Sequence, residues 1–235
     1  MVLLALLLTP HAIDPTTITT GPGQTEPVKL KDGSGLFVGA DTKVIIHDEV
    51  HERRIELPYG QVISTVQHDS TRPFYVHTPL ATVRAVGTKF AVDHRDGRTE
   101  VTTSDGQVLI QRNTHWGFGL SESAQAARDQ QVIVKPGEPM IPRAIDADAW
   151  LAWERGLVVV RQASVQSAIA RFNRHSAFAL KVPRDSEIPL ITVTGTFDVH
   201  RPDLLERFLD EQLRKRKELK SQAQKQPKSI PRTDP

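Results

Sequence analysis

The sequence contains no cysteine among its 235 residues. Disulfide scaffolds, thiolate zinc sites, iron–sulfur ligation and cysteine nucleophiles are therefore excluded. Cysteine usage also says nothing about the redox state of the compartment, and any metal site would depend on histidine or carboxylate ligands.

The sequence also lacks a strong charge of one sign. Its 30 Lys and Arg residues nearly balance 28 Asp and Glu residues, for a formal net charge of +2. A protein that coats a polyanion is therefore not indicated. Residues 214–235 hold eight basic and two acidic residues and so carry +6. No aromatic residue interleaves these charges, so we expect a basic, disordered tail without a nucleic-acid contact.

No apolar run is long enough to span a bilayer. Val2–Leu8 is a run of seven apolar residues, far short of the ~20 that a membrane-spanning helix requires. It is either an atypical export signal or the end of a membrane helix that begins upstream of Met1. A non-helical spacer rich in Thr, Pro and Gly follows over residues 13–27, so we expect the first domain to begin after residue 27.

Residues 28–145 are typical of an all-β domain. Short β-branched runs alternate with turn signals about every eight to twelve residues. Three Asp-Gly pairs predict hairpin turns, because both residue types tolerate positive φ. Strands with one wet and one buried face are expected at residues 53–57 and 99–102, and a long loop at 113–129. The three pairs are Asp32-Gly33, Asp96-Gly97 and Asp105-Gly106.

Residues 146–213 predict a small α+β domain with the order β-α-β-β-α. Apolar residues recur at helical spacing after Ser164, a residue suited to cap a helix. A second helix opens at Pro202 and carries one leucine-rich stripe. Strands are expected at residues 157–160, 179–182 and 190–197. We place the domain boundary near Asp146.

Three patterns could indicate a metal, catalytic or phosphate-binding site, but the residues around each pattern argue against it. His47 and His51 have the i, i+4 spacing of a helical metal site, but strand-like runs flank them. Ser64, His68 and Ser104 lack a nucleophile elbow. The glycines at 33, 35 and 39 precede no helix that could hold a phosphate. The sequence therefore predicts no enzyme, no metal and no cofactor.

Three tryptophans allow a different function. Trp116, Trp150 and Trp153 could form a platform for a carbohydrate. Trp150 and Trp153, however, lie three residues apart at the head of the α+β domain. Packing within that domain is the favoured interpretation.

Short motifs follow one another in a fixed order along the β domain. They are Asp32, Gly33 and Ser34, then Arg72, Pro73 and Phe74, then Gly87, Thr88 and Phe90, and finally Gly106. Their order resembles the periplasmic region of FecR-family regulators. Residues Trp153–Leu157, Ile169–Arg174 and Val193–Phe197 further resemble the short secretin/TonB N-terminal-like domain that closes those proteins. Together these matches span about residues 28–209.

The resemblance implies a mainly β fold, a rolled or solenoid-like sheet followed by the α+β domain, and no enzyme activity. Such regulators are transmembrane anti-sigma sensors in the inner membrane of Gram-negative bacteria. A cytoplasmic segment binds an extracytoplasmic-function sigma factor. The periplasmic part contacts the signalling domain of an outer-membrane TonB-dependent receptor, as in iron transport. We expect that partner at a strand edge formed by Leu190, Ile191, Thr192, Val193, Thr194 and Phe197.

The sequence also differs from the usual FecR-family pattern at both ends. Members usually carry a sigma-binding segment and a complete spanning helix before the periplasmic region, and here only Val2–Leu8 stands in that place. We therefore favour a clipped membrane helix, with inner-membrane anchoring if that helix is complete upstream. The closing strands of the small domain are absent after Leu213, which leaves a sheet edge bare.

Two other interpretations remain open. The chain could be a free periplasmic binding module, for a carbohydrate or a protein, that has lost the signalling arm. It could also be the product of a degenerate gene.

Overall fold

The computed structural model describes residues 15–48, 52–113, 122–185 and 187–225. The chain divides into two compact units, residues 1–154 and residues 155–235. The second unit begins nine residues after Asp146, where the sequence suggested the boundary. We describe each unit by itself.

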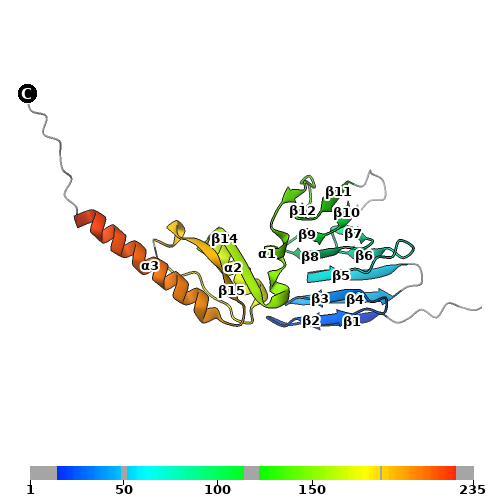
Figure 1. Cartoon of the computed structure of the whole chain (residues 1–235), viewed down its shortest axis with the longest axis horizontal. Helices are drawn as coiled ribbons and strands as arrows, with labels where there is room; N and C mark the ends of the chain where they lie inside the picture. Colours follow the sequence, from blue (N-terminus) through cyan, green and yellow to red (C-terminus); the bar gives the residue numbers. More distant parts are fainter. Residues whose placement is uncertain (1–14, 49–51, 114–121, 186, 226–235) are drawn as a thin grey trace, which may run out of the picture. The chain divides into compact units, whose positions relative to one another are not determined.

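The first unit, the β unit, consists of two strand layers (Figure 1). Layer A has the order β1-β4-β5-β6-β7-β10-β11, and layer B has the order β2-β3-β5-β8-β9-β12-β13. The predicted rolled, all-β architecture is confirmed. The strands are β1 (Thr16–Thr20), β2 (Glu26–Lys29), β3 (Gly35–Val38), β4 (Thr42–Asp48), β5 (Arg53–Thr65), β6 (Phe74–His77), β7 (Ala81–Ala85), β8 (Lys89–Arg95), β9 (Arg98–Asp105), β10 (Gln107–Arg112), β11 (Ser123–Ala127), β12 (Gln130–Val134) and β13 (Arg143–Ala144).

Strand β5 joins the two layers because it belongs to both. Its first half pairs with β4 and β6, and its second half pairs with β3 and β8. The strand changes layer near Gly60, which has a φ of +100°, and the register against β4 shifts between Lys43 and Ile45. A bulge and a glycine are the devices that bend a strand from one layer into the next. The sheet therefore curls into a half-barrel.

The core lies between the two layers. Inward-facing residues alternate along the strands, and Ile55, Leu57, Val62 and Val92 are fully buried. The rings of Phe74 and Phe90 meet edge to face, with centroids 6.4 Å apart. The aromatic residues of two sequence motifs thus form one contact in the centre of the β unit.

Only one of the three Asp-Gly pairs forms the two-residue hairpin that the sequence predicts. Asp96 and Gly97 both have positive φ, 50° and 69°, and join β8 to β9. Asp32-Gly33 lies in a longer connection between β2 and β3. Asp105-Gly106 forms no hairpin, because β8 and β12 already occupy both edges of β9. This third pair instead carries the chain from layer B to layer A.

Three further expectations for this unit are wrong. The predicted spacer contains all of β1 and the start of β2, because β-branched threonines pair as a strand although they are polar. The predicted loop at 113–129 contains β11, whose Ala126 is buried. The expected wet face at 99–102 does not exist, since its threonines hydrogen bond inside the fold to Thr78 and Gln131.

A short helical segment closes the β unit. It consists of α1 (Ala147–Trp150) and the turn η1 (Ala152–Arg155). The ring of Trp153 lies 5.6 Å from that of Phe37, beside Ile63 and Ala91. The predicted packing of Trp150 and Trp153 in the α+β domain is therefore wrong, because the β unit provides the apolar surface that covers them.

The second unit, the α+β unit, is a two-stranded sheet with two helices. Its core joins Val158 and Val160 of β14 to Phe172 of α2 and Leu205 of α3. No strand forms at the predicted residues 179–182. The final helix continues to residue 225, so the disorder predicted from residue 214 onward is wrong for residues 214–225. The elements are β14 (Leu157–Ser164), α2 (Val165–His175), η2 (Ile188–Leu190), β15 (Thr192–Asp198) and α3 (Pro202–Lys225).

We predict that Gly60→Ala is far more destabilising than Gly97→Ala. A Cβ at residue 60 would lie 2.4 Å from the Cα of Thr42, whereas a Cβ at residue 97 meets nothing within 4 Å. Both sites have positive φ, so the strain of a left-handed alanine, about 1 kcal/mol, is common to both. We expect Gly60→Ala to lower the free energy of unfolding by about 3 kcal/mol.

Urea unfolding followed by tryptophan fluorescence measures this difference. All three tryptophans lie within residues 1–154, so the signal reports the β unit. Equal losses in the two variants would contradict the proposed role of Gly60.

Candidate functional site

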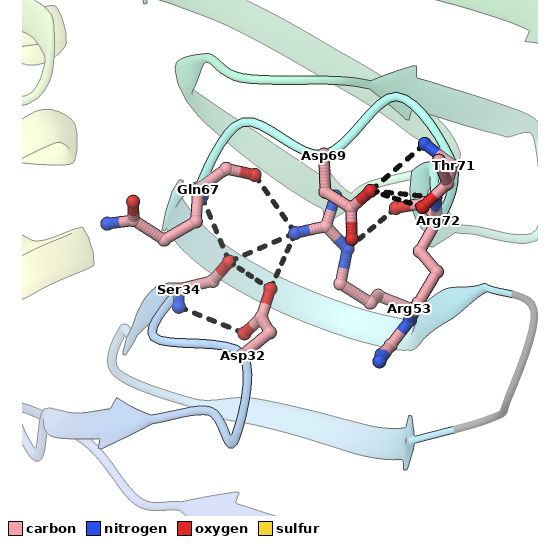
Figure 2. A network of polar contacts seen from close by, with 7 residues as sticks. All are labelled: Asp32, Ser34, Arg53, Gln67, Asp69, Thr71 and Arg72. Atoms are coloured by element: carbon pink, nitrogen blue, oxygen red, sulfur yellow. Dashed lines mark hydrogen bonds and ion pairs between the residues drawn. The ribbon is translucent and has the colours of Figure 1, made fainter.

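The guanidinium of Arg53 is the centre of a network of polar contacts in the β unit (Figure 2). Arg53 is the first residue of β5 and is only 3% exposed. Its Nη1 donates to Asp32 Oδ2 at 2.5 Å and to the carbonyl of Gln67 at 3.0 Å, and its Nε donates to the carbonyl of Arg72 at 2.9 Å. The guanidinium also lies 5.6 Å from the centre of the Phe74 ring. A buried cation is tolerated only with partners of this kind.

Asp32 and Ser34 form the acidic side of this network. The backbone N–H and hydroxyl of Ser34 donate to Asp32 at 2.9 and 2.6 Å, and the Ser34 hydroxyl accepts from the Gln67 N–H at 3.0 Å. Burial opposes ionisation of Asp32, but the hydrogen bonds from Ser34 and Arg53 outweigh it and hold the pKa of Asp32 below its ordinary value. The ion pair between Asp32 and Arg53 is thus kept charged.

The network fixes the loop that follows β5. Strand β6 runs parallel to the first half of β5, so residues 66–73 must bring the chain from the end of β5 back to its start. Asp69 organises this return, because it accepts from the N–H and hydroxyl of Thr71 and from the N–H of Arg72. Arg53 holds both ends of the loop through the carbonyls of Gln67 and Arg72.

The remaining motif residues support the other side of the same loop. The carbonyl of Thr88 accepts from the N–H of Val66 at 2.9 Å. A Cβ on Gly87 would lie 2.8 Å from the His68 ring, and a Cβ on Gly106 would lie 2.8 Å from the Thr88 methyl. Close backbone approach therefore requires glycine at both positions. The structure brings the β-domain motifs together around residues 66–73 and Phe74.

The sequence analysis missed Arg53, Gln67, Asp69 and Thr71. The signal for Arg53 was present, since Arg53, Ile55 and Leu57 share one face of a period-two strand and two of them are apolar. Gln67 takes part through its backbone, for which a sequence carries no signal.

This network positions the backbone of residues 66–73. No group of three or more His, Asp or Glu side chains able to hold a metal occurs among the described residues. Of the candidate histidine pair, His47 lies in β4 and contacts Glu56 at 3.0 Å, while residues 49–51 lie outside the described residues. Trp116 also lies outside them, and Trp153 is buried.

The predicted partner-binding residues divide between the core and the surface of the α+β unit. Ile191, Val193 and Phe197 are buried. Thr192 and Thr194 are exposed, and Leu190 just before β15 is 55% exposed. In the described part of the unit β15 pairs with β14 alone. The surface available to a partner is therefore the threonine face and open edge of β15 together with Leu190.

The basic residues at the end of α3 are used inside the α+β unit. Lys217 reaches Asp185 at 2.7 Å, and Lys220 and Arg216 reach Glu187 at 2.7 and 3.2 Å. The hydrogen bond from Lys217 lowers the pKa of Asp185, and that from Lys220 lowers the pKa of Glu187. We call these five residues the α3 latch. They hold Asp185 and Glu187 against α3, which explains why the helix extends into the predicted tail.

The described residues thus define a curled β domain with a structural polar centre, followed by a small α+β domain with an open strand edge. Residues 16–109 match the model of the FecR family, described as "FecR protein". This match confirms the FecR resemblance that the motifs of the β unit predict.

Two crystal structures from Parabacteroides distasonis ATCC 8503, each described as a "putative anti-sigma factor", share the fold. The one at 2.50 Å resolution has 22% identity and a TM-score of 0.64, and covers 84% of this chain and 89% of its own. The one at 1.65 Å resolution has 20% identity and a TM-score of 0.66, and covers 84% and 91%. No curated protein matches the chain. Within the described residues, no helix has both the length and the apolar character needed to cross a membrane.

We predict that Arg53→Met lowers the free energy of unfolding of the β unit by about 3 kcal/mol, because Asp32 loses its buried cation. Arg54→Ala is the matched control. Arg54 contacts Glu52 and Glu56 at a more exposed site, so its loss should cost below about 1 kcal/mol. Urea unfolding followed by tryptophan fluorescence checks both, and an Arg53→Met loss as small as the control would refute the role of Arg53.

We also predict that the α3 latch opens in acid. Asp185 and Glu187 have folded pKa values below their ordinary ones, so their contribution to stability is present above the ordinary values and is lost as the pH falls through the folded ones. Asp185→Asn with Glu187→Gln should open the latch at neutral pH. We expect about tenfold faster amide hydrogen exchange in the last turns of α3.

Glu211→Gln is the control for the latch, because Glu211 pairs with Lys215 within α3 itself. It should leave the exchange of the last turns nearly unchanged. Equal exchange in the double variant and the control would mean that α3 is held without the latch.

Proposed function

We propose that the chain is the sensor part of a FecR-type anti-sigma regulator in cell-surface signalling. In this role it relays the state of an outer-membrane TonB-dependent receptor, of the kind that takes up iron chelates, to an extracytoplasmic-function sigma factor. The match of residues 16–109 to the FecR family model supports the proposal. The likeness in fold to two proteins described as putative anti-sigma factors supports it too, and this likeness covers 84% of the chain. The proposed location is the periplasm, with an inner-membrane anchor.

The open edge of β15 is the observation that best supports the proposed contact with a partner protein. Its exposed threonines alternate with residues of the core, and β14 is its one strand partner in the described unit. An edge of this kind can accept a further strand from another protein through main-chain hydrogen bonds. Leu190 adjoins the edge and would supply an apolar anchor.

The regulator role needs no chemistry within the chain. The polar centre around Arg53 is bonded to backbone carbonyls and to Asp32, so its residues are engaged in holding the fold. The buried Trp153 does not favour the alternative of a carbohydrate-binding module, since a sugar platform needs exposed rings. Recognition of a protein partner is the function that the exposed features serve best.

A binding experiment with the signalling domain of a TonB-dependent receptor from the same genome tests the proposal. We expect the full chain to bind that domain and Leu190→Asp to weaken binding at least about tenfold, by placing a charge in an apolar contact. Leu219→Asp is the matched control, because Leu219 is 66% exposed on α3. It should bind as the unchanged chain does.

Isothermal titration calorimetry gives both affinities. Absence of binding to each such signalling domain in the genome would refute the receptor partner. Equal affinities for the two leucine variants would refute the proposed surface.

A further inference from the structure

Strand β1 is an unprotected sheet edge in the β unit. Among the described residues, β1 pairs with β4 alone. Its sequence is Thr-Thr-Ile-Thr-Thr, with no charge, no proline and no bulge. Sheet edges are usually blocked by such features, and the edge strand β2 of the other layer carries Glu26, Pro27 and Lys29. The edge of β1 is therefore open to a further strand.

A narrow apolar slot lies next to this edge. Its volume is about 260 Å³, and it separates β2 of layer B from β1, β4 and β5 of layer A. Thr16, at the start of β1, forms part of its wall. The register pairs Thr16 with Ile46, a half-buried residue of the core, so Thr16 is on the inner face of layer A. The apolar wall of the slot consists of Val28, Leu30, Ile46 and Ile55.

A free cation borders the slot. Lys29 lines it, and the Lys29 side chain makes no hydrogen bond or ion pair with any residue that the structure describes. The acid of the slot, Asp32, is engaged by Arg53. The slot thus combines an apolar interior with an unused positive charge at its border. This combination suits an apolar side chain with a carboxylate nearby.

We propose that the edge of β1 is a strand-addition site for an extended segment of a partner protein. The segment would pair with Thr16–Thr20, place one large apolar side chain in the slot beside Thr16, and bring an Asp or Glu to Lys29. Successive residues of a strand point to opposite faces, so one residue in two would face the slot. Main-chain hydrogen bonds supply affinity in this mode and the slot supplies specificity. The site is separate from β15, and its failure would leave the proposed function untouched.

A second copy of the chain is the rival occupant. The β1 sequence is the same in both directions about Ile18, so two copies could pair around a two-fold axis. Such a pair would offer only threonines and Ile18 to the slot and no acid to Lys29. Ile18 already packs against the core of its own unit. The charge and shape of the slot therefore favour a different partner.

The test selects phage-displayed random heptapeptides against the full chain and measures a selected, synthesised peptide by fluorescence anisotropy. We expect peptides with alternating β-branched residues, one large apolar residue and an Asp or Glu. Thr17→Lys charges the open edge, and Lys29→Glu reverses the charge at the slot. Each should weaken binding about tenfold. Hydrogen exchange at Thr16–Thr20 should slow when the peptide binds.

Two controls match these variants. Thr65→Lys places the same change on an exposed residue of β5 that β3 and β8 already flank. Arg84→Glu reverses an exposed charge on β7. Both should bind the peptide as the unchanged chain does.

Three results would overturn the proposal. The first is that no peptide is selected. The second is that selected peptides bind Thr17→Lys and Lys29→Glu as tightly as the controls. The third is that sedimentation shows a dimer of the full chain that Thr17→Lys converts to a monomer, since a second copy would then occupy the edge.

Discussion

The buried ion pair between Arg53 and Asp32 is the interaction on which the β unit depends. Because β6 lies parallel to the start of β5, a loop, residues 66–73, has to connect the end of β5 to that start. This loop has few apolar side chains to bury, so hydrogen bonds to its backbone hold it in place. Arg53 supplies them from the start of β5, and Asp32 keeps the arginine oriented. The buried arginine bonds Asp32 and two loop carbonyls through Nε and Nη1, and an arrangement that breaks these bonds would leave a buried cation without them.

The two units use polar residues in opposite ways. In the β unit the central charges are buried and bonded to backbone, which suits a rigid scaffold. In the α+β unit the α3 latch joins exposed basic side chains of a helix to Asp185 and the buried Glu187 of a loop, and its acids respond to pH. The open edge of β15 belongs to the second unit. A partner contact there would involve the less tightly bonded part of the chain, as regulatory surfaces commonly do.

Local patterns in the sequence predicted the class of each unit but not how the strands are shared. The apolar stripe after Ser164 and the turn at Asp96-Gly97 each depend on neighbours in sequence, and both formed as expected. The hairpin at Asp105-Gly106 failed because the edges of β9 were taken by strands distant in sequence. The disorder expected for residues 214–225 failed because Asp185 and Glu187, distant in the sequence, pair with three of the basic residues of this segment. The motif residues were identified through a resemblance to a family. That they all support one loop, residues 66–73, is visible only in the three-dimensional contacts.

A double-mutant cycle on Arg53 and Asp32 tests most directly whether this pair organises the β unit. The cycle compares Arg53→Met, Asp32→Leu and the double variant with the unchanged chain, using urea unfolding followed by tryptophan fluorescence. We predict a coupling free energy of about 2 kcal/mol or more, with the double variant more stable than the sum of the single losses implies. A coupling below about 0.5 kcal/mol would mean that the two residues act independently, and the account of the β unit given above would be wrong.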